Sequence, residues 1–248
     1  MNTPLEQAPG FFGKLVQQGD FVSRRLTPNW IALWDRWLRA CLHHSQQQLA
    51  SAWPAAYKAS PIWRFALAAG VCDAHAWVGI VMPSSDRVGR PFPLTIALAT
   101  AAEASILKHL QHPATWFEQI ERLAVSSFEH TCSLAQFDAA LLALERPGFS
   151  TSSTLALKQN AQQNTPGRAS SAALYRLPLA NLGALDASAS RLAATEQSGS
   201  GNTLSSLWWN ATAAQPGSLL ACQGLPSPAA FCAMLNGRWA EHGWRNLA

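Results

Sequence analysis

The sequence has 248 residues, of which 48% are hydrophobic and only 13% are charged, compared with about 25% charged residues in a typical soluble domain. Its net charge is +4, and its one basic doublet is Arg24-Arg25, so the clustered basic face of a nucleic-acid-binding protein is not expected. No run approaches the ~20 consecutive apolar residues of a membrane span, and residues 1–6 lack the cationic and apolar regions of a signal peptide, so we expect a cytoplasmic protein that is not inserted into a membrane.

The N-terminal third is predicted to contain a short strand or turn followed by a long helix. Residues 10–15 form the strand or turn. The helix begins at Thr27, a typical N-cap residue followed by Pro28 at the first helical position, and continues to Leu49. Apolar residues recur along it at helical spacing, among them Trp30, Trp34 and Trp37, which predicts that this stripe packs into a core.

The rest of the chain predicts a mixture of strands and helices. Short apolar runs bounded by Pro, Gly or Asp predict strands over 62–68, 76–82 and 94–99, and helices follow over 113–130 and 134–145. Further along, a helix over 185–194, strands over 204–209 and 219–222, and a helix over 228–235 capped by Ser227 are predicted. Trp208 and Trp209 are adjacent in a strand and must face opposite sides, which favours a second buried layer over an exposed indole.

A break in composition divides the chain. Arg146-Pro147-Gly148 is a strong breaker, and the polar, aperiodic residues after it, up to Pro166-Gly167, are typical of a mobile loop. We therefore predict an N-terminal α/β domain over 1–146, a linker over 147–170 and a smaller C-terminal α+β part over 171–248.

The sequence contains no recognisable catalytic or cofactor motif. It lacks phosphate-binding Gly-rich motifs, and Gly199-Ser200-Gly201 does not have the spacing of a nucleophile elbow. The five cysteines are widely separated, which favours reduced thiols over a metal site. The adjacent His43-His44 side chains diverge by ~100° on a helix and cannot chelate one ion. We expect no enzymatic activity, no cofactor and no metal.

Two dense segments stand out, and each sets acidic and basic residues among apolar ones. Residues 10–26 contain Asp20, Arg24 and Arg25, and residues 82–94 contain Asp86, Arg87 and Arg90. One interpretation is structural: Asp86 hydrogen-bonds its own turn while Arg87 or Arg90 bridges to a carboxylate, and Lys14 lies on a solvated strand. The other is functional: the six residues form a recognition surface, or a site for a phosphorylated ligand.

These two segments, together with Trp34-Asp35-Arg36-Trp37-Leu38 and Ser60-Pro61-Ile62-Trp63-Arg64-Phe65-Ala66-Leu67, resemble the signature blocks of the TagF (ImpM) family of bacterial type VI secretion systems. The resemblance covers most of residues 10–98. It implies a three-layer α/β/α sandwich around a mixed, largely antiparallel sheet, similar to longin or profilin-like domains. It also implies a non-enzymatic accessory protein that represses secretion after translation.

The partner that the resemblance implies is the system's forkhead-associated-domain scaffold protein, with baseplate components as further candidates. Sequestration of such a component would remove it from assembly. Two alternatives remain open: a phospho-ligand sensor or cryptic enzyme using Asp20, Asp86, Arg24, Arg87 and Arg90, and a structural subunit that stays in the assembled machine.

Overall fold

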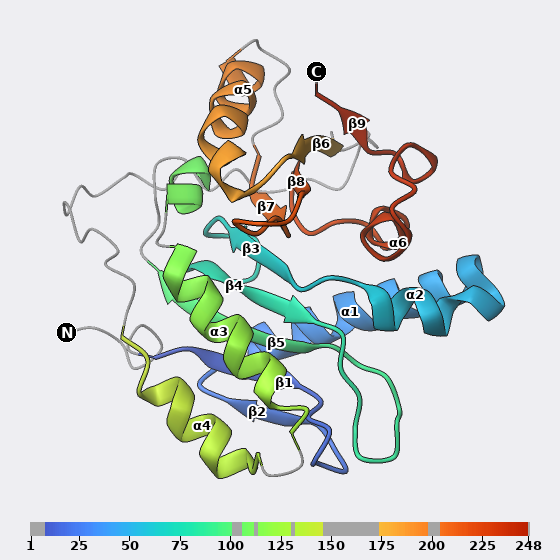
Figure 1. The fold of residues 1–248 in the computed structure, drawn as a ribbon, viewed down its shortest axis with the longest axis vertical. Helices are drawn as coiled ribbons and strands as arrows, with labels where there is room; N and C mark the ends of the chain where they lie inside the picture. Colours follow the sequence, from blue (N-terminus) through green and yellow to red (C-terminus); the bar gives the residue numbers. More distant parts are fainter. Residues whose placement is uncertain are drawn as a thin grey trace.

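The computed structural model describes residues 8–100, 106–111, 114–129, 132–145, 174–197 and 204–247 (Figure 1). Outside the described residues lie the predicted linker over 147–170, Gly199-Ser200-Gly201, and both end residues of the helix predicted over 113–130. The strands are β1 (Gly10–Gly13), β2 (Val22–Arg24), β3 (Trp63–Leu67), β4 (Ala76–Met82), β5 (Leu94–Thr100), β6 (Leu174–Leu179), β7 (Ser206–Trp209), β8 (Gly217–Cys222) and β9 (Arg245–Asn246). The α-helices are α1 (Pro28–Leu49), α2 (Trp53–Ala59), α3 (Ala114–Ser126), α4 (Leu134–Leu142), α5 (Leu185–Gln197) and α6 (Pro228–Asn236). The 3₁₀ turns are η2 (Ala50–Ala52), η3 (Ile106–Gln111), η4 (Leu182–Ala184) and η5 (Ala240–His242).

All these strands belong to one open sheet. Its order is β2-β1-β5-β4-β3-β7-β8-β6-β9, and within the described residues every strand pair is antiparallel except β6 with β9. The pairing of β3 with β7 joins strands from the two halves of the chain, with Phe65 opposite Trp208. The sheet is therefore continuous between the predicted N-terminal domain and the predicted C-terminal part.

Helices cover both faces of this sheet, which confirms the predicted α/β/α layering. In Figure 1, α3 crosses in front of the strands of the first half, α4 lies at the lower left beside β1 and β2, and α1 runs behind the strands. In the central strands β3, β4, β5, β7 and β8, alternate residues enter two separate cores. In β4, for example, Val78 and Ile80 pack with the α3 and α4 side chains, and Trp77 and Val81 pack with the α1 and α6 side chains. Because a strand buried on both faces has no polar side, this explains the continuous apolar runs in the sequence.

The long helix α1 forms as predicted. The Thr27 hydroxyl accepts a hydrogen bond from the Trp30 amide at 3.2 Å, and Pro28 occupies the first turn. Trp34 is fully buried, and its indole Nε1 donates to Thr95 Oγ1 at 2.8 Å. Trp37 is half-buried and packs edge-on against Phe231 of α6, so it lies at the border of the core.

The tryptophan pair of β7 also lies as predicted. Trp208 packs in the α1 and α6 core, and Trp209 packs in the α3 core, each at most 2% exposed. The Ser227 cap of α6 is confirmed by a 3.2 Å hydrogen bond from the Ala230 amide.

Three strands and one α-helix were not predicted from the sequence: β2, β6, β9 and α2. Strands β2 and β9 have only three and two residues, too few for a periodic pattern. Strand β6 contains Pro178, which normally argues against a strand. It forms because β8 pairs with it along its whole length, from Leu174 opposite Cys222 to Leu179 opposite Gly217.

Candidate functional site

The two signature segments, more than fifty residues apart in the sequence, lie side by side. Strand β1 pairs with β5, and this pairing brings the loop after β1 next to the loop that precedes β5. The Arg87 amide donates to the Gln18 carbonyl at 2.9 Å, and Arg90 Nη2 donates to the Gly19 carbonyl at 2.9 Å. We call the residues 14–21 and 83–93 together the signature surface.

Asp86 organises the second loop from inside. Its side chain is fully buried; Oδ1 accepts from the amides of Val88 and Arg90, and Oδ2 accepts from Lys14 Nζ at 2.9 Å and from Arg90 Nε at 2.6 Å. Burial alone raises the pKa of this carboxyl, but the hydrogen bonds from Lys14 and Arg90, together with the Lys14 charge, outweigh it and hold the pKa well below its usual range. This confirms the interpretation of Asp86 as a turn residue bridged by Arg90.

Lys14 corrects an expectation. It was predicted on a solvated strand, but it is only 7% exposed and its ammonium group reaches both Asp86 and the Arg90 carbonyl, the latter at 3.2 Å. The physical reason is that a buried carboxylate needs a cation within hydrogen-bonding distance. Further inside, Ser84 Oγ donates to the Lys14 carbonyl at 2.8 Å, and the Tyr57 hydroxyl donates to the Ser84 carbonyl at 2.9 Å.

The arginine doublet belongs to a different contact. Arg25 Nη1 lies 2.6 Å from Asp138 Oδ1 on α4, its Nε donates to the Pro9 carbonyl, and its φ is +54°. Arg24 Nε lies 3.9 Å from Asp138 and its side chain is half exposed. The six predicted site residues are therefore not one cluster, because Arg24 and Arg25 connect β2 to α4 while Asp86 and Arg90 hold the signature surface.

Several side chains of the signature surface remain open to solvent. Asp20 is exposed and accepts a hydrogen bond from the Phe21 amide at 2.8 Å. Arg87 is exposed and makes no ion pair within the described part of the chain, Val88 is 70% exposed, and the side chain of Arg90 is 64% exposed.

Sequence reasoning did not identify Arg39 as part of this region. The Arg39 guanidinium of α1 lies 5.3 Å from the Phe21 ring centre and 5.7 Å from that of Phe92. Its i,i+4 ion pair with Asp35 was the only local signal, and such a pair points to nothing beyond the helix itself.

Within the described ranges, no group of three or more His, Cys, Asp or Glu side chains is arranged to hold a metal ion. The five cysteines are unpaired, and burial raises the pKa of the Cys72 thiol to about 12, with the nearby Asp73 charge adding to the effect. No helix in the described part of the chain is long and apolar enough to cross a membrane.

Comparison with known proteins places this geometry in context. Residues 10–144 match the TagF N-terminal domain, described as type VI secretion system-associated. The structure is similar to a crystal structure of PA0076 from Pseudomonas aeruginosa PAO1, with a TM-score of 0.65 and 35% identity over 93% of this chain and 95% of that chain. No curated protein shows a significant match.

Proposed function

The chain belongs to the family of type VI secretion system-associated proteins with a TagF N-terminal domain, and on this basis we propose that it represses secretion after translation by binding the system's forkhead-associated-domain scaffold protein. In this mechanism the bound scaffold, or a baseplate component in its place, is removed from assembly. The protein acts by occupancy in the cytoplasm, without catalysis.

The observation that supports this proposal most is the set of buried contacts that holds the signature surface together. Its two loops are held by the buried Lys14–Asp86 ion pair and by Arg90, so little conformational entropy remains to be lost on binding. Arg87 and Val88 project from this support into solvent. An arginine fork beside an exposed apolar residue suits a protein surface that presents carboxylates or phosphates.

The same geometry does not favour the cryptic-enzyme alternative at these residues. Asp86 is inaccessible, and a carboxyl with a strongly lowered pKa is a poor general base near neutral pH. A phosphorylated ligand could contact Arg87, but Asp86 and Arg90 are already engaged with each other.

The test measures binding of the purified protein to the scaffold protein from the same secretion system, together with the melting temperature of each variant. We expect Arg87→Ala to weaken binding at least about tenfold, equivalent to ~1.4 kcal/mol, and to leave the melting temperature nearly unchanged. Arg90→Lys should instead lower the melting temperature, because Lys lacks the planar guanidinium with which Arg90 donates to both the Asp86 carboxylate and the Gly19 carbonyl. Arg238→Ala, at an exposed arginine outside the signature surface, is the matched control.

If the wild-type protein does not bind the scaffold protein, the proposed partner is wrong. If it binds and Arg87→Ala binds equally well, the partner stands and the proposed surface is wrong. In cells, overproduction of the wild-type protein should reduce secreted effector in the medium without reducing the amounts of the secretion components. A structural subunit would instead co-purify with the assembled machine. Fractionation that leaves the protein in the membrane pellet after carbonate washing would contradict the cytoplasmic location.

A further inference from the structure

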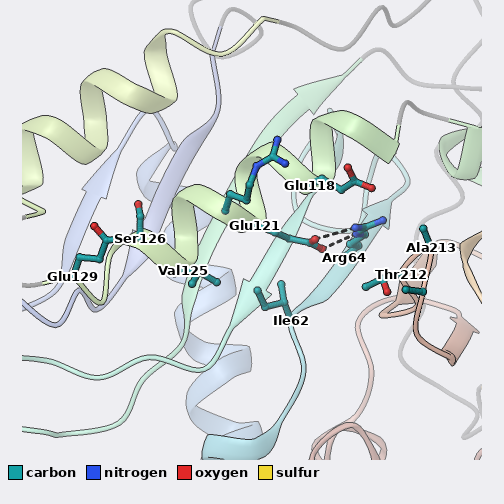
Figure 2. Close-up of a pocket in the computed structure, with 11 residues that line it drawn as sticks. Ile62, Arg64, Glu118, Glu121, Val125, Ser126, Glu129, Thr212 and Ala213 are labelled. Carbon is teal, nitrogen blue, oxygen red and sulfur yellow. Dashed lines mark hydrogen bonds and ion pairs between the residues drawn. The ribbon is translucent and has the colours of Figure 1, made fainter.

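A groove lies on the α3 face of the sheet, over the junction of β3 and β7. Two adjoining hollows of about 560 and 540 Å³ share Arg64 and Ala213 among their lining residues. Arg64 of β3 and Trp209 of β7 are opposite each other in the strand register, so residues from both halves of the chain form the floor of the groove. Figure 2 shows the first hollow, with α3 residues along one side and Thr212 and Ala213 of the β7–β8 connection along the other.

Arg64 is held rigidly at the bottom of this groove. Its side chain is 2% exposed, and its Nε and Nη2 donate to the two carboxylate oxygens of Glu121 at 2.6 and 2.9 Å. The guanidinium also lies 5.5 Å from the ring centre of Phe117. These contacts fix the plane and direction of the guanidinium.

The remaining nitrogen of Arg64, Nη1, is buried and makes no hydrogen bond with the residues that the structure describes. In Figure 2 the free end of the guanidinium points away from Glu121, toward the side of the groove that carries Thr212 and Ala213. Native proteins satisfy the great majority of buried donors, so a fixed donor left unpaired by the described residues marks a position for a further acceptor atom.

The charges around the groove indicate the kind of molecule that brings this acceptor. The charges of Arg64 and Glu121 cancel each other. The other charged residues of the lining are three acidic ones and one basic one: Glu118, Glu129, Asp186 and Arg122. The groove is thus acidic on a protein whose net charge is +4. An apolar strip accompanies these charges, because Val125 is 51% exposed beside half-buried Ile62.

We propose that this groove docks an extended, basic segment of a partner protein. A backbone carbonyl of the segment accepts the hydrogen bond from Arg64 Nη1, its Lys or Arg side chains lie against Glu118 and Glu129, and an apolar side chain packs on Val125. The rim residues Arg122, Glu129, Thr212 and Ala213 are exposed, so the groove is open enough for a chain to lie along it. The proposal does not depend on the signature surface or on the identity of the scaffold partner.

The test measures peptide binding by fluorescence anisotropy with two pools of short, labelled peptide amides. Every peptide of the Lys pool has two fixed Lys residues, every peptide of the Glu pool has two fixed Glu residues, and the other positions are random. We expect the Lys pool to bind and the Glu pool not to bind. The double variant Glu118→Lys/Glu129→Lys should weaken binding of the Lys pool at least about tenfold, because the negative charges that attract the peptide's Lys side chains are replaced by positive charges that repel them. The control is Glu241→Lys, which makes the charge change of one of these two substitutions at an exposed site outside the groove and should bind as the wild type does.

A second measurement locates the bound peptides. The Lys pool should slow amide hydrogen exchange in residues 114–129 and 206–216 and leave residues 15–25 unchanged. The proposal is overturned if the Lys pool does not bind with a dissociation constant below about 1 mM, or if both pools bind equally. It is also overturned if Glu241→Lys weakens binding as much as the groove variant does, or if the protected amides lie outside the groove. Glu118 lies half-buried within α3, Glu129 lies exposed beyond its end, and neither belongs to the buried core, so these outcomes do not depend on a variant that removes a core contact.

Discussion

The Arg64–Glu121 ion pair offers the sharpest test of how this fold is held together, through the substitution Glu121→Gln. In the native protein the carboxylate accepts two hydrogen bonds from a guanidinium whose side chain is 2% exposed, while Glu121 itself is 19% exposed. The substitution leaves the arginine charge in place and removes its counter-charge. Breaking a buried pair in this way costs about 3–5 kcal/mol, and the partial exposure of Glu121 places the expected loss near the lower end, at about 3 kcal/mol.

Urea unfolding followed by tryptophan fluorescence measures this loss. With a slope of about 3 kcal/mol per molar urea, the unfolding midpoint should fall by about 1 M. Glu118→Gln, one turn earlier on the same helix, is the matched control and should change the free energy of unfolding by no more than about 0.5 kcal/mol.

The double substitution Arg64→Met/Glu121→Met removes both charges of the pair at once. Because apolar residues can replace a buried ion pair with little net loss, the double variant should be more stable than Glu121→Gln. A loss below about 1 kcal/mol for Glu121→Gln would refute the reasoning, because the pair would then behave as an ordinary surface ion pair.

Three further predictions concern the core, the sheet and the signature surface. Trp34→Ala should lower the free energy of unfolding by about 3–5 kcal/mol, measured by denaturant titration, and a variant that unfolds like the wild type would exclude Trp34 from the core. Gly79→Ala should give insoluble or unfolded protein, because a Cβ there collides with the Ile96 carbonyl and the Phe65 ring. Gly89→Ala is the comparison, because a Cβ there meets open space and the φ of +84° should cost only about 1 kcal/mol of folding free energy. Equal solubility and equal melting temperatures of the two variants would contradict this. Asp86 has a lowered pKa in the folded state, so its contribution to stability is present above the unfolded pKa of about 4 and is lost as the pH falls further. Asp86→Asn should therefore lower the urea midpoint at pH 7 and flatten the dependence of that midpoint on pH below about 4. Parallel pH curves for the variant and the wild type would count against the buried ion pair.

Local patterns in the sequence determined most of the regular elements. The cap at Thr27, the proline after it and the helical spacing of the tryptophans predicted α1 with its observed ends, because these signals act within a few residues of one another. The adjacent Trp208 and Trp209 predicted a sheet buried on both faces, because the side chains of a strand alternate. The resemblance of residues 10–98 to the TagF family predicted the layering, which the structure confirms.

Only the tertiary structure decided which distant residues meet. Lys14 and Asp86 are 72 residues apart and Arg64 and Glu121 are 57 apart, and nothing in the spacing of either pair identifies its partner. Strand β6 exists because β8 supplies its hydrogen bonds in spite of Pro178, and the two halves of the chain share one sheet because β3 pairs with β7. Periodicity reports which face of an element is buried, but strand order and ion-pair partners depend on how the elements pack, and so the groove over Arg64 could be found only after the whole sheet was in place.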